Sequence, residues 1–245
     1  MLTDGTLFDA RMLLGEPILD EERQVVEAPA GLTIGELGTW LALRGWSLPR
    51  AGTSAHPTLG GAVATASHGT GVDTTSLSDP GSLRGIRGIG ANGAFDLDAD
   101  HPEDPEDLAA LRVHLGAFGV VTHVRLAVSR GARIEVETVD APLDAVPDPE
   151  VRASAPQVEA WWLPGGDRVL LTRRRPTEFP LTVQDHRALA RHRLWGEDLP
   201  LTLVTTLARF APLPSPLVNA TTRPAPLPSR IVAAPTPTTL TSAPP

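Results

Sequence analysis

The sequence predicts an α+β protein with a mixed sheet and flanking helices over residues 1–130, a smaller α+β domain over residues 131–211, and a tail over residues 212–245. Two segments of the first part carry helix caps followed by apolar residues at helical spacing. Short alternating runs between and after them are typical of strands. The tail holds 10 of the 25 prolines, a composition that favours extended or disordered chain.

The first helix is expected over residues 33–45. Thr33 and Glu36 fit a capping box, in which the threonine accepts from the first turn and the glutamate reaches back to the cap. Leu37 and Leu41 follow at helical spacing, and Gly45 suits the left-handed conformation that ends a helix.

The second helix is expected over residues 104–116, with Asp104 as its cap and Pro105 at the first helical position. A glycine follows its last turn. Its apolar face consists of three leucines: Leu108, Leu111 and Leu115.

The strands are marked by alternation and by turn residues. The Asn92-Gly93 pair predicts a tight hairpin within residues 83–99, and Gly165-Gly166 predicts a second turn. Residues 201–210 fit either a helix or a strand. Strands are expected over residues 24–28, 46–48, 120–126, 133–139, 158–164 and 168–173.

The composition excludes several classes of function. A net charge of -8 argues against a general nucleic-acid binder, which needs a basic surface. The absence of cysteine excludes disulfides and thiolate chemistry, and no metal site is expected, since the spacing of Asp185, His186 and His192 fits no standard ligand set. No apolar run approaches the ~20 residues of a membrane-spanning helix. We expect a cytoplasmic protein, with peripheral membrane association left open.

Residues 52–71 form a glycine-rich stretch of small side chains with little periodicity. Glycine allows a ligand to approach the main chain closely, and the amides and hydroxyls of this stretch suit phosphate or ring oxygens. Because no cationic side chain lies within it, negative charge would be met by amide dipoles, as in an anion-binding nest. The alternative is that these residues form tight turns between buried strands.

Several motifs together resemble the vanillyl-alcohol oxidase superfamily of FAD-linked oxidases. The most specific is LGGAVATASHGTG at residues 59–71, supported by LGAFGVVT at 115–122 and EAWWLP at 159–164. Residues 26–32 and 45–49 also agree. Within the superfamily, the sequence is most similar to the D-arabinono-1,4-lactone, L-gulono-1,4-lactone and alditol oxidases, over roughly residues 3–215.

The resemblance implies an FAD-binding domain of the PCMH type, FAD as cofactor, and hydride transfer from a sugar-derived CH–OH group to the flavin, which oxygen or another acceptor then reoxidises. Val121 matches a position whose backbone meets the adenine end. His68 alone could suggest a general base, but its counterpart lies in the flavin loop, so a structural histidine is the favoured interpretation. The other cofactor-binding residues implied are Thr53, Thr58, Gly61, Thr65, Ala66, Ser67 and His68.

The resemblance also predicts that the chain lacks the first flavin subdomain and most of the substrate domain. No catalytic residue is assigned, the substrate is expected to be a polyol or sugar lactone, and a partner chain could complete the flavin domain. The alternative is a non-catalytic fragment or split-gene piece that binds FAD weakly or acts as an interaction module.

Two other motifs are given little weight. The glycines of residues 88–93 match the dinucleotide fingerprint formally, but no helix is expected to follow them. The run Arg173-Arg174-Arg175 is interpreted as a solvated strand end and not as a phosphate grip.

Overall fold

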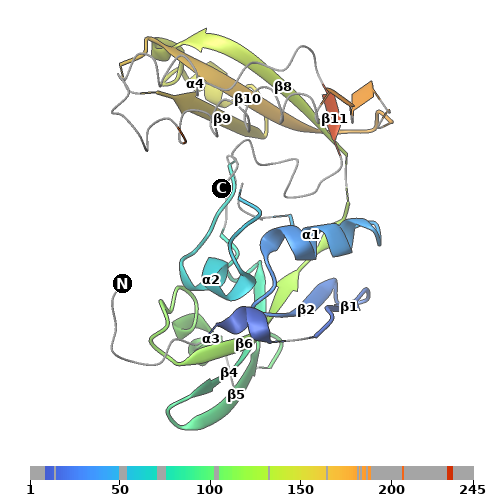
Figure 1. Cartoon of the computed structure of the whole chain (residues 1–245), viewed down its shortest axis with the longest axis vertical. Coiled ribbons are helices and arrows are strands. Elements are labelled where there is room, and N and C mark those ends of the chain that lie inside the picture. The colour runs from blue at the N-terminus through green and yellow to red at the C-terminus, as the bar shows by residue number, and fades with distance from the viewer. Residues whose placement is uncertain are drawn as a thin grey trace. The chain divides into compact units, whose positions relative to one another are not determined.

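The computed structural model describes residues 9–13, 15–49, 54–70, 76–101, 105–131, 133–163, 165–180, 182, 184–185, 187–188, 206 and 231–233. The chain divides into two compact units. Unit 1 comprises Met1–Gly69 and Thr74–Arg130, and unit 2 comprises Thr70–Asp73 and Gly131–Pro245. Both units contain a sheet with few helices (Figure 1), which confirms the α+β class. Their assignment to flavin and substrate binding stays a prediction.

Unit 1 is built on a five-stranded sheet in the order β1-β2-β6-β4-β5. Every pairing described in it is antiparallel, so the mixed sheet that the sequence predicts is antiparallel throughout these residues. A short pair, β3 and β7, lies outside it. The strands are β1 Ile18–Asp20, β2 Val25–Pro29, β3 Trp46–Ser47, β4 Leu83–Gly90, β5 Gly93–Asp98, β6 Val120–Ala127 and β7 Ser129–Arg130.

The hairpin of β4 and β5 is confirmed, with its turn displaced by one residue. Gly90 pairs with Gly93, so Ala91 and Asn92 form the turn. Gly93 then opens β5 with a φ of +109°, a left-handed value that favours glycine. Since a strand and not a helix follows, the formal dinucleotide fingerprint is confirmed as a chance match.

Helix α1 (Ile34–Ala42) forms as the sequence predicts. The hydroxyl of Thr33 accepts from the amide of Glu36 at 3.1 Å, while the Glu36 carboxylate accepts from the Thr33 amide at 2.8 Å. Gly45 has a φ of +76° after the last turn. The capping signals therefore placed this helix correctly at both ends.

The other helices of unit 1 correct the sequence analysis. The glycine-rich stretch contains a helix, α2 (Leu59–Ala64), where little periodicity was expected. Helix α3 spans Pro105–Ala110, shorter than predicted; Asp104, its expected cap, lies outside the described residues. Leu115 lies beyond this helix and is 74% exposed, so its assignment to the apolar face was wrong. A 3-10 turn, Ala10–Met12, precedes β1.

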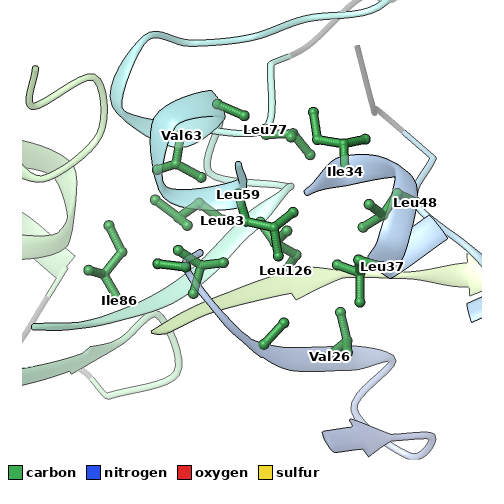
Figure 2. Packing of buried hydrophobic residues seen from close by; sticks show 14 of the residues in the cluster. Val26, Ile34, Leu37, Leu48, Leu59, Val63, Leu77, Leu83, Ile86 and Leu126 are labelled. Carbon is green, nitrogen blue, oxygen red and sulfur yellow. The ribbon is translucent and has the colours of Figure 1, made fainter. Parts of the chain in front are cut away.

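Unit 1 has a single large apolar core. Side chains from α1 and α2 meet those of β2, β4 and β6, as Figure 2 shows for Ile34, Val63 and Leu126. These residues are fully buried. The core therefore holds α2 and the residues after it against the sheet.

Unit 2 contains a four-stranded antiparallel sheet in the order β11-β8-β10-β9. The hairpin around Gly165 is confirmed. Within the tail, Ile231–Ala233 is an ordered strand, because β11 pairs with β8 and Ile231 is buried there. The elements are β8 Arg133–Pro142, a 3-10 turn Leu143–Ala145, α4 Pro149–Arg152, β9 Gln157–Trp162, β10 Arg168–Thr177 and β11 Ile231–Ala233.

The arginine run of β10 is another correction. The Arg174 side chain is 3% exposed and its Nη1 lies 2.8 Å from a carboxylate oxygen of Glu159, which is 14% exposed. Its neighbour Arg173 donates to the hydroxyl of Ser154. The run is therefore partly buried and paired, because strand alternation turns its middle residue inward.

None of the helices in the described part of the chain is long and apolar enough to cross a membrane.

Candidate functional site

Helix α2 is anchored at its start by the turn after β2. The amide of Leu59 donates to the carbonyl of Leu32 at 2.7 Å, and that of Gly60 donates to Ala30 at 2.9 Å. A Cβ on Gly60 would lie 3.1 Å from the Cβ of Ala30, so glycine permits this close approach. Gly60 therefore allows the start of α2 to pack closely against the turn after β2.

The first turn is closed by its own cap. The hydroxyl of Thr58 accepts from the amide of Gly61 at 3.3 Å. At the other end, the amides of Thr65, Ala66 and Ser67 donate to carbonyls of α2. These amides are occupied, so the expected anion-binding nest is wrong for this part of the stretch.

The stretch is nevertheless accessible. Gly61, Thr65 and His68 are exposed, while Thr58, Ala66 and Ser67 are half-buried. We call the first three the α2 ridge. Any cofactor lying here would meet small side chains and carbonyl groups more than free amides.

His68 has a defined ring orientation. Its Nδ1 lies 3.0 Å from the carbonyl oxygen of Gly69, and its backbone forms a bridge with Ser76. A carbonyl oxygen only accepts, so Nδ1 carries the hydrogen and Nε2 is left as an acceptor. This contact supports the structural interpretation of the histidine.

Val121 packs in the same apolar core as helix α2, which carries part of the ridge. It is buried in β6 opposite Gly88 and belongs to the same apolar cluster as Leu59 and Val63 of α2. The structure therefore brings the predicted residues of 58–68 and position 121 into one unit. Thr53 lies outside the described residues.

Sequence reasoning named residues 115–122 as a supporting motif but did not predict that residues 111–119 form a loop, since it extended the helix to residue 116. The amide of Leu115 donates to the carbonyl of Ala64 at 3.2 Å, which ties this loop to the end of α2. His114 is 8% exposed, its Nδ1 accepts from the amide of Gly116 at 3.0 Å, and burial lowers its pKa. No spacing pattern in the sequence distinguishes this histidine from a surface residue.

The face of the sheet in unit 1 also carries charge. Arg125 lies 2.7 Å from Glu27 and 2.8 Å from Asp96, so it links three strands. Desolvation raises the pKa of Asp96, but hydrogen bonds and charge from Arg125 and Arg87 outweigh it and leave that pKa below its ordinary value. The network stabilises the sheet and offers no unpaired cation for catalysis among these residues.

Unit 2 contains an apolar groove of about 530 Å³ beside α4. Its wall includes Val146, Val151, Val158 and Leu171, with Arg152 as the charged member. The described residues contain no group of three acidic or histidine side chains placed to hold a metal ion.

Known proteins match the first part of the chain and longer stretches of it. Residues 2–93 match the family model of the FAD binding domain. The chain is 33% identical over 124 residues to an L-gulono-1,4-lactone dehydrogenase of Mycobacterium tuberculosis, covering 51% of this chain and 28% of that protein. It is 29% identical over 181 residues to an alditol oxidase of a Streptomyces species, covering 72% of this chain and 42% of that protein. The chain thus spans less than half the length of these relatives.

Solved structures show the same fold. A cholesterol oxidase from Brevibacterium sterolicum superposes with a TM-score of 0.63 at 15% identity, over 93% of this chain and 48% of that one. An alkyldihydroxyacetonephosphate synthase gives 0.55 at 17% identity, over 69% of this chain and 37% of that one. The chain therefore matches the FAD binding domain over residues 2–93, which indicates FAD as cofactor, shares its fold with the matching part of cholesterol oxidase, and is similar in sequence to an L-gulono-1,4-lactone dehydrogenase and an alditol oxidase.

Proposed function

We propose that this chain holds FAD for an oxidoreductase acting on a CH–OH group of a sugar lactone or polyol. The observation that carries the proposal is the match of residues 2–93 to the FAD binding domain. Gly61, Thr65 and His68 of the α2 ridge lie within that stretch and are exposed. Bound FAD would supply the hydride acceptor, and the protein would supply orientation and electrostatics.

The residues present fit such a group. Apart from the backbone of its own helix and its chain neighbours, a Cβ on Gly61 would meet only the Thr58 hydroxyl oxygen, at 3.1 Å, within 4 Å among the described residues, so its outer side is open there. The residues proposed to contact FAD are Thr53, Thr58, Gly61, Thr65, Ala66, Ser67, His68 and Val121.

The class of substrate is proposed from the relatives, which are sugar-lactone and alditol enzymes by name. The groove of unit 2 does not suit a polyol, because its wall is mainly apolar and a polyol needs several hydrogen-bonding partners. We assign no catalytic residue.

A flavin titration tests the proposal. FAD added to the purified chain should quench tryptophan fluorescence and shift the flavin absorbance bands, and oxygen uptake or dye reduction with aldonolactones and polyols should then be measured. No binding of FAD would contradict the proposal.

A matched pair of variants locates the site. Gly61→Glu places bulk and negative charge on the α2 ridge and should weaken FAD binding at least tenfold, or about 1.4 kcal/mol. Leu43→Glu changes another exposed position, at the end of α1, and should leave binding unchanged. If both variants bind FAD with equal affinity, the α2 ridge is not the FAD-binding site.

A second candidate is a binding module that associates with a partner chain. Ile89, Val113, Leu115, Phe118 and Val120 are exposed apolar residues, and Ile89 pairs with Val120 across β4 and β6. Exposed apolar pairs such as Ile89 and Val120 are found at docking surfaces. Light scattering should show that the wild-type chain forms an assembly, with itself or with a candidate partner, and that the double variant Ile89→Ser/Phe118→Ser does not. If the wild-type chain stays monomeric both alone and with candidate partners, this second candidate function is contradicted.

A further inference from the structure

We infer that the loop of residues 111–119 contains a phosphate subsite for the flavin nucleotide, formed by the Nε2–H of His114 and the Nε–H of Arg112. The inference rests on the proposed binding of FAD and adds side-chain contacts that neither the sequence motif nor the family match assigns.

The first observation is a pair of buried donors without acceptors. His114 Nε2 and Arg112 Nε are both buried and have no hydrogen-bond partner among the described residues. Leaving a buried donor unpaired is costly, and native proteins do so rarely. Two such atoms, two residues apart on one loop, indicate that a ligand supplies the missing acceptors.

The chemistry of His114 follows from its other nitrogen. Because Nδ1 accepts from the Gly116 amide, the hydrogen of the neutral ring lies on Nε2. Burial lowers the pKa of this histidine and so favours the neutral ring. His114 therefore offers a fixed N–H donor, and Arg112 adds a cationic one.

The backbone gives a second, independent observation. Val113 and Leu115, on either side of His114, have φ values of +49° and +51°. Residues with side chains adopt such values at a cost, and they do so most often where function requires a particular geometry. Such strained conformations persist only where the surrounding structure holds them, and here they flank His114 on both sides.

The place of the loop connects it with the α2 ridge. The Leu115 amide donates to the carbonyl of Ala64, one residue before Thr65 of the ridge. The amides of Gly61 and Thr65 on the ridge are occupied, so these two residues have little to offer a phosphate. The neighbouring loop would supply the missing hydrogen-bond donors to a phosphate, since guanidinium and imidazole N–H groups bind phosphate oxygens well.

The test uses variants that remove one hydrogen-bond donor each and are chosen to leave the fold intact. His114→Asn retains an acceptor at the δ position for the Gly116 amide and loses the ε donor, and Arg112→Met retains the aliphatic stem. His101→Asn, at an exposed histidine of the same unit, is the control. Affinities for FAD, FMN and riboflavin are measured by fluorescence, with circular dichroism to verify folding.

We expect each variant to bind FAD about tenfold more weakly, with riboflavin affinity and the control unchanged. Wild-type affinity for FAD in both variants would overturn the phosphate subsite and leave the proposed function intact. An equal loss for FAD and riboflavin in folded variants would also overturn it, because the contact would then lie on the ring system. Failure of the wild-type chain to bind FAD would overturn the proposed function, and this inference with it.

Discussion

The two sheets use the same kind of ion pair in different surroundings. In unit 1, Arg87 and Asp96 are 41% and 46% exposed, and they belong to a network along the strands. In unit 2, Arg174 and Glu159 are 3% and 14% exposed. Solvent screens the first pair and not the second, so removal of one partner should matter only where the other is left buried. Burial, and not residue type, decides the energetic role of an arginine here.

The largest effect is expected from breaking the buried pair. Arg174→Met should lower the free energy of unfolding by about 3 kcal/mol, because Glu159 is left charged in a buried place. Arg168→Met removes a partner of the half-exposed pair with Asp140 and should cost less than about 1 kcal/mol. Urea unfolding followed by tryptophan fluorescence measures both; similar costs would contradict the distinction between buried and exposed pairs.

The apolar core of unit 1 should show a contrast nearly as large. Leu126 is fully buried, so Leu126→Ala should destabilise by about 3 kcal/mol through lost transfer energy and a cavity. Leu115→Ala should change stability by less than about 0.5 kcal/mol, since that leucine is exposed. A large loss of unfolding free energy in Leu115→Ala would mean that Leu115 packs on an apolar helical face after all.

Loss of the α1 cap should have an intermediate effect. Thr33→Ala removes the hydroxyl that accepts from the Glu36 amide and should cost about 1 kcal/mol in urea or thermal unfolding. The backbone bond from Thr33, followed by its hydroxyl, lowers the pKa of Glu36. Removal of the hydroxyl should move that pKa partly back, as NMR titration would show; an unchanged pKa would mean that the backbone bond alone sets it.

The smallest effect concerns acid stability of the exposed network. The side-chain bond from Arg23 lowers the pKa of Asp100, with Arg84 adding to it. Since the folded pKa lies below the unfolded one, this contribution is present above the unfolded pKa of about 3.9 and is lost as pH falls through the folded pKa. Asp100→Asn should flatten the stability profile between about pH 5 and 2 by less than about 1 kcal/mol.

Asp144→Asn is the control for this measurement, because that carboxylate is exposed and forms no ion pair within the described residues. Identical profiles for both variants would show that solvent screens the Asp100 contacts completely.

Much of the local structure could be predicted because its signals are local. The box of Thr33 and Glu36 identified α1, and the turn residues identified the β4–β5 hairpin to within one position. Helix α2 escaped prediction because three of its six residues are alanine or valine and two are glycine, which leaves no amphipathic pattern. The buried strand at Ile231 was missed because proline-rich composition argued against it.

For the candidate site, too, the sequence located the segment but not its hydrogen bonding. The motif at residues 59–71 located the stretch, and the family match confirmed the kind of domain. Neither the motif nor the match showed that the amides of Thr65, Ala66 and Ser67 are occupied, nor that His114 and Arg112 carry unpaired donors on the loop tied to the end of α2. Hydrogen-bond satisfaction is a property of neighbours in space, and motifs do not record it.

By itself, the sequence determined the fold class, the ends of α1, the main hairpins and the resemblance to FAD-linked oxidases. All of these depend on residues within a few positions of each other or on motifs kept together in the chain. Tertiary structure alone decided which polar groups are buried, which arginine is enclosed and which loop lies beside α2. Those outcomes depend on packing between residues far apart in sequence, as with Leu115 and Ala64, and burial is what gives a charge or a donor its energetic weight.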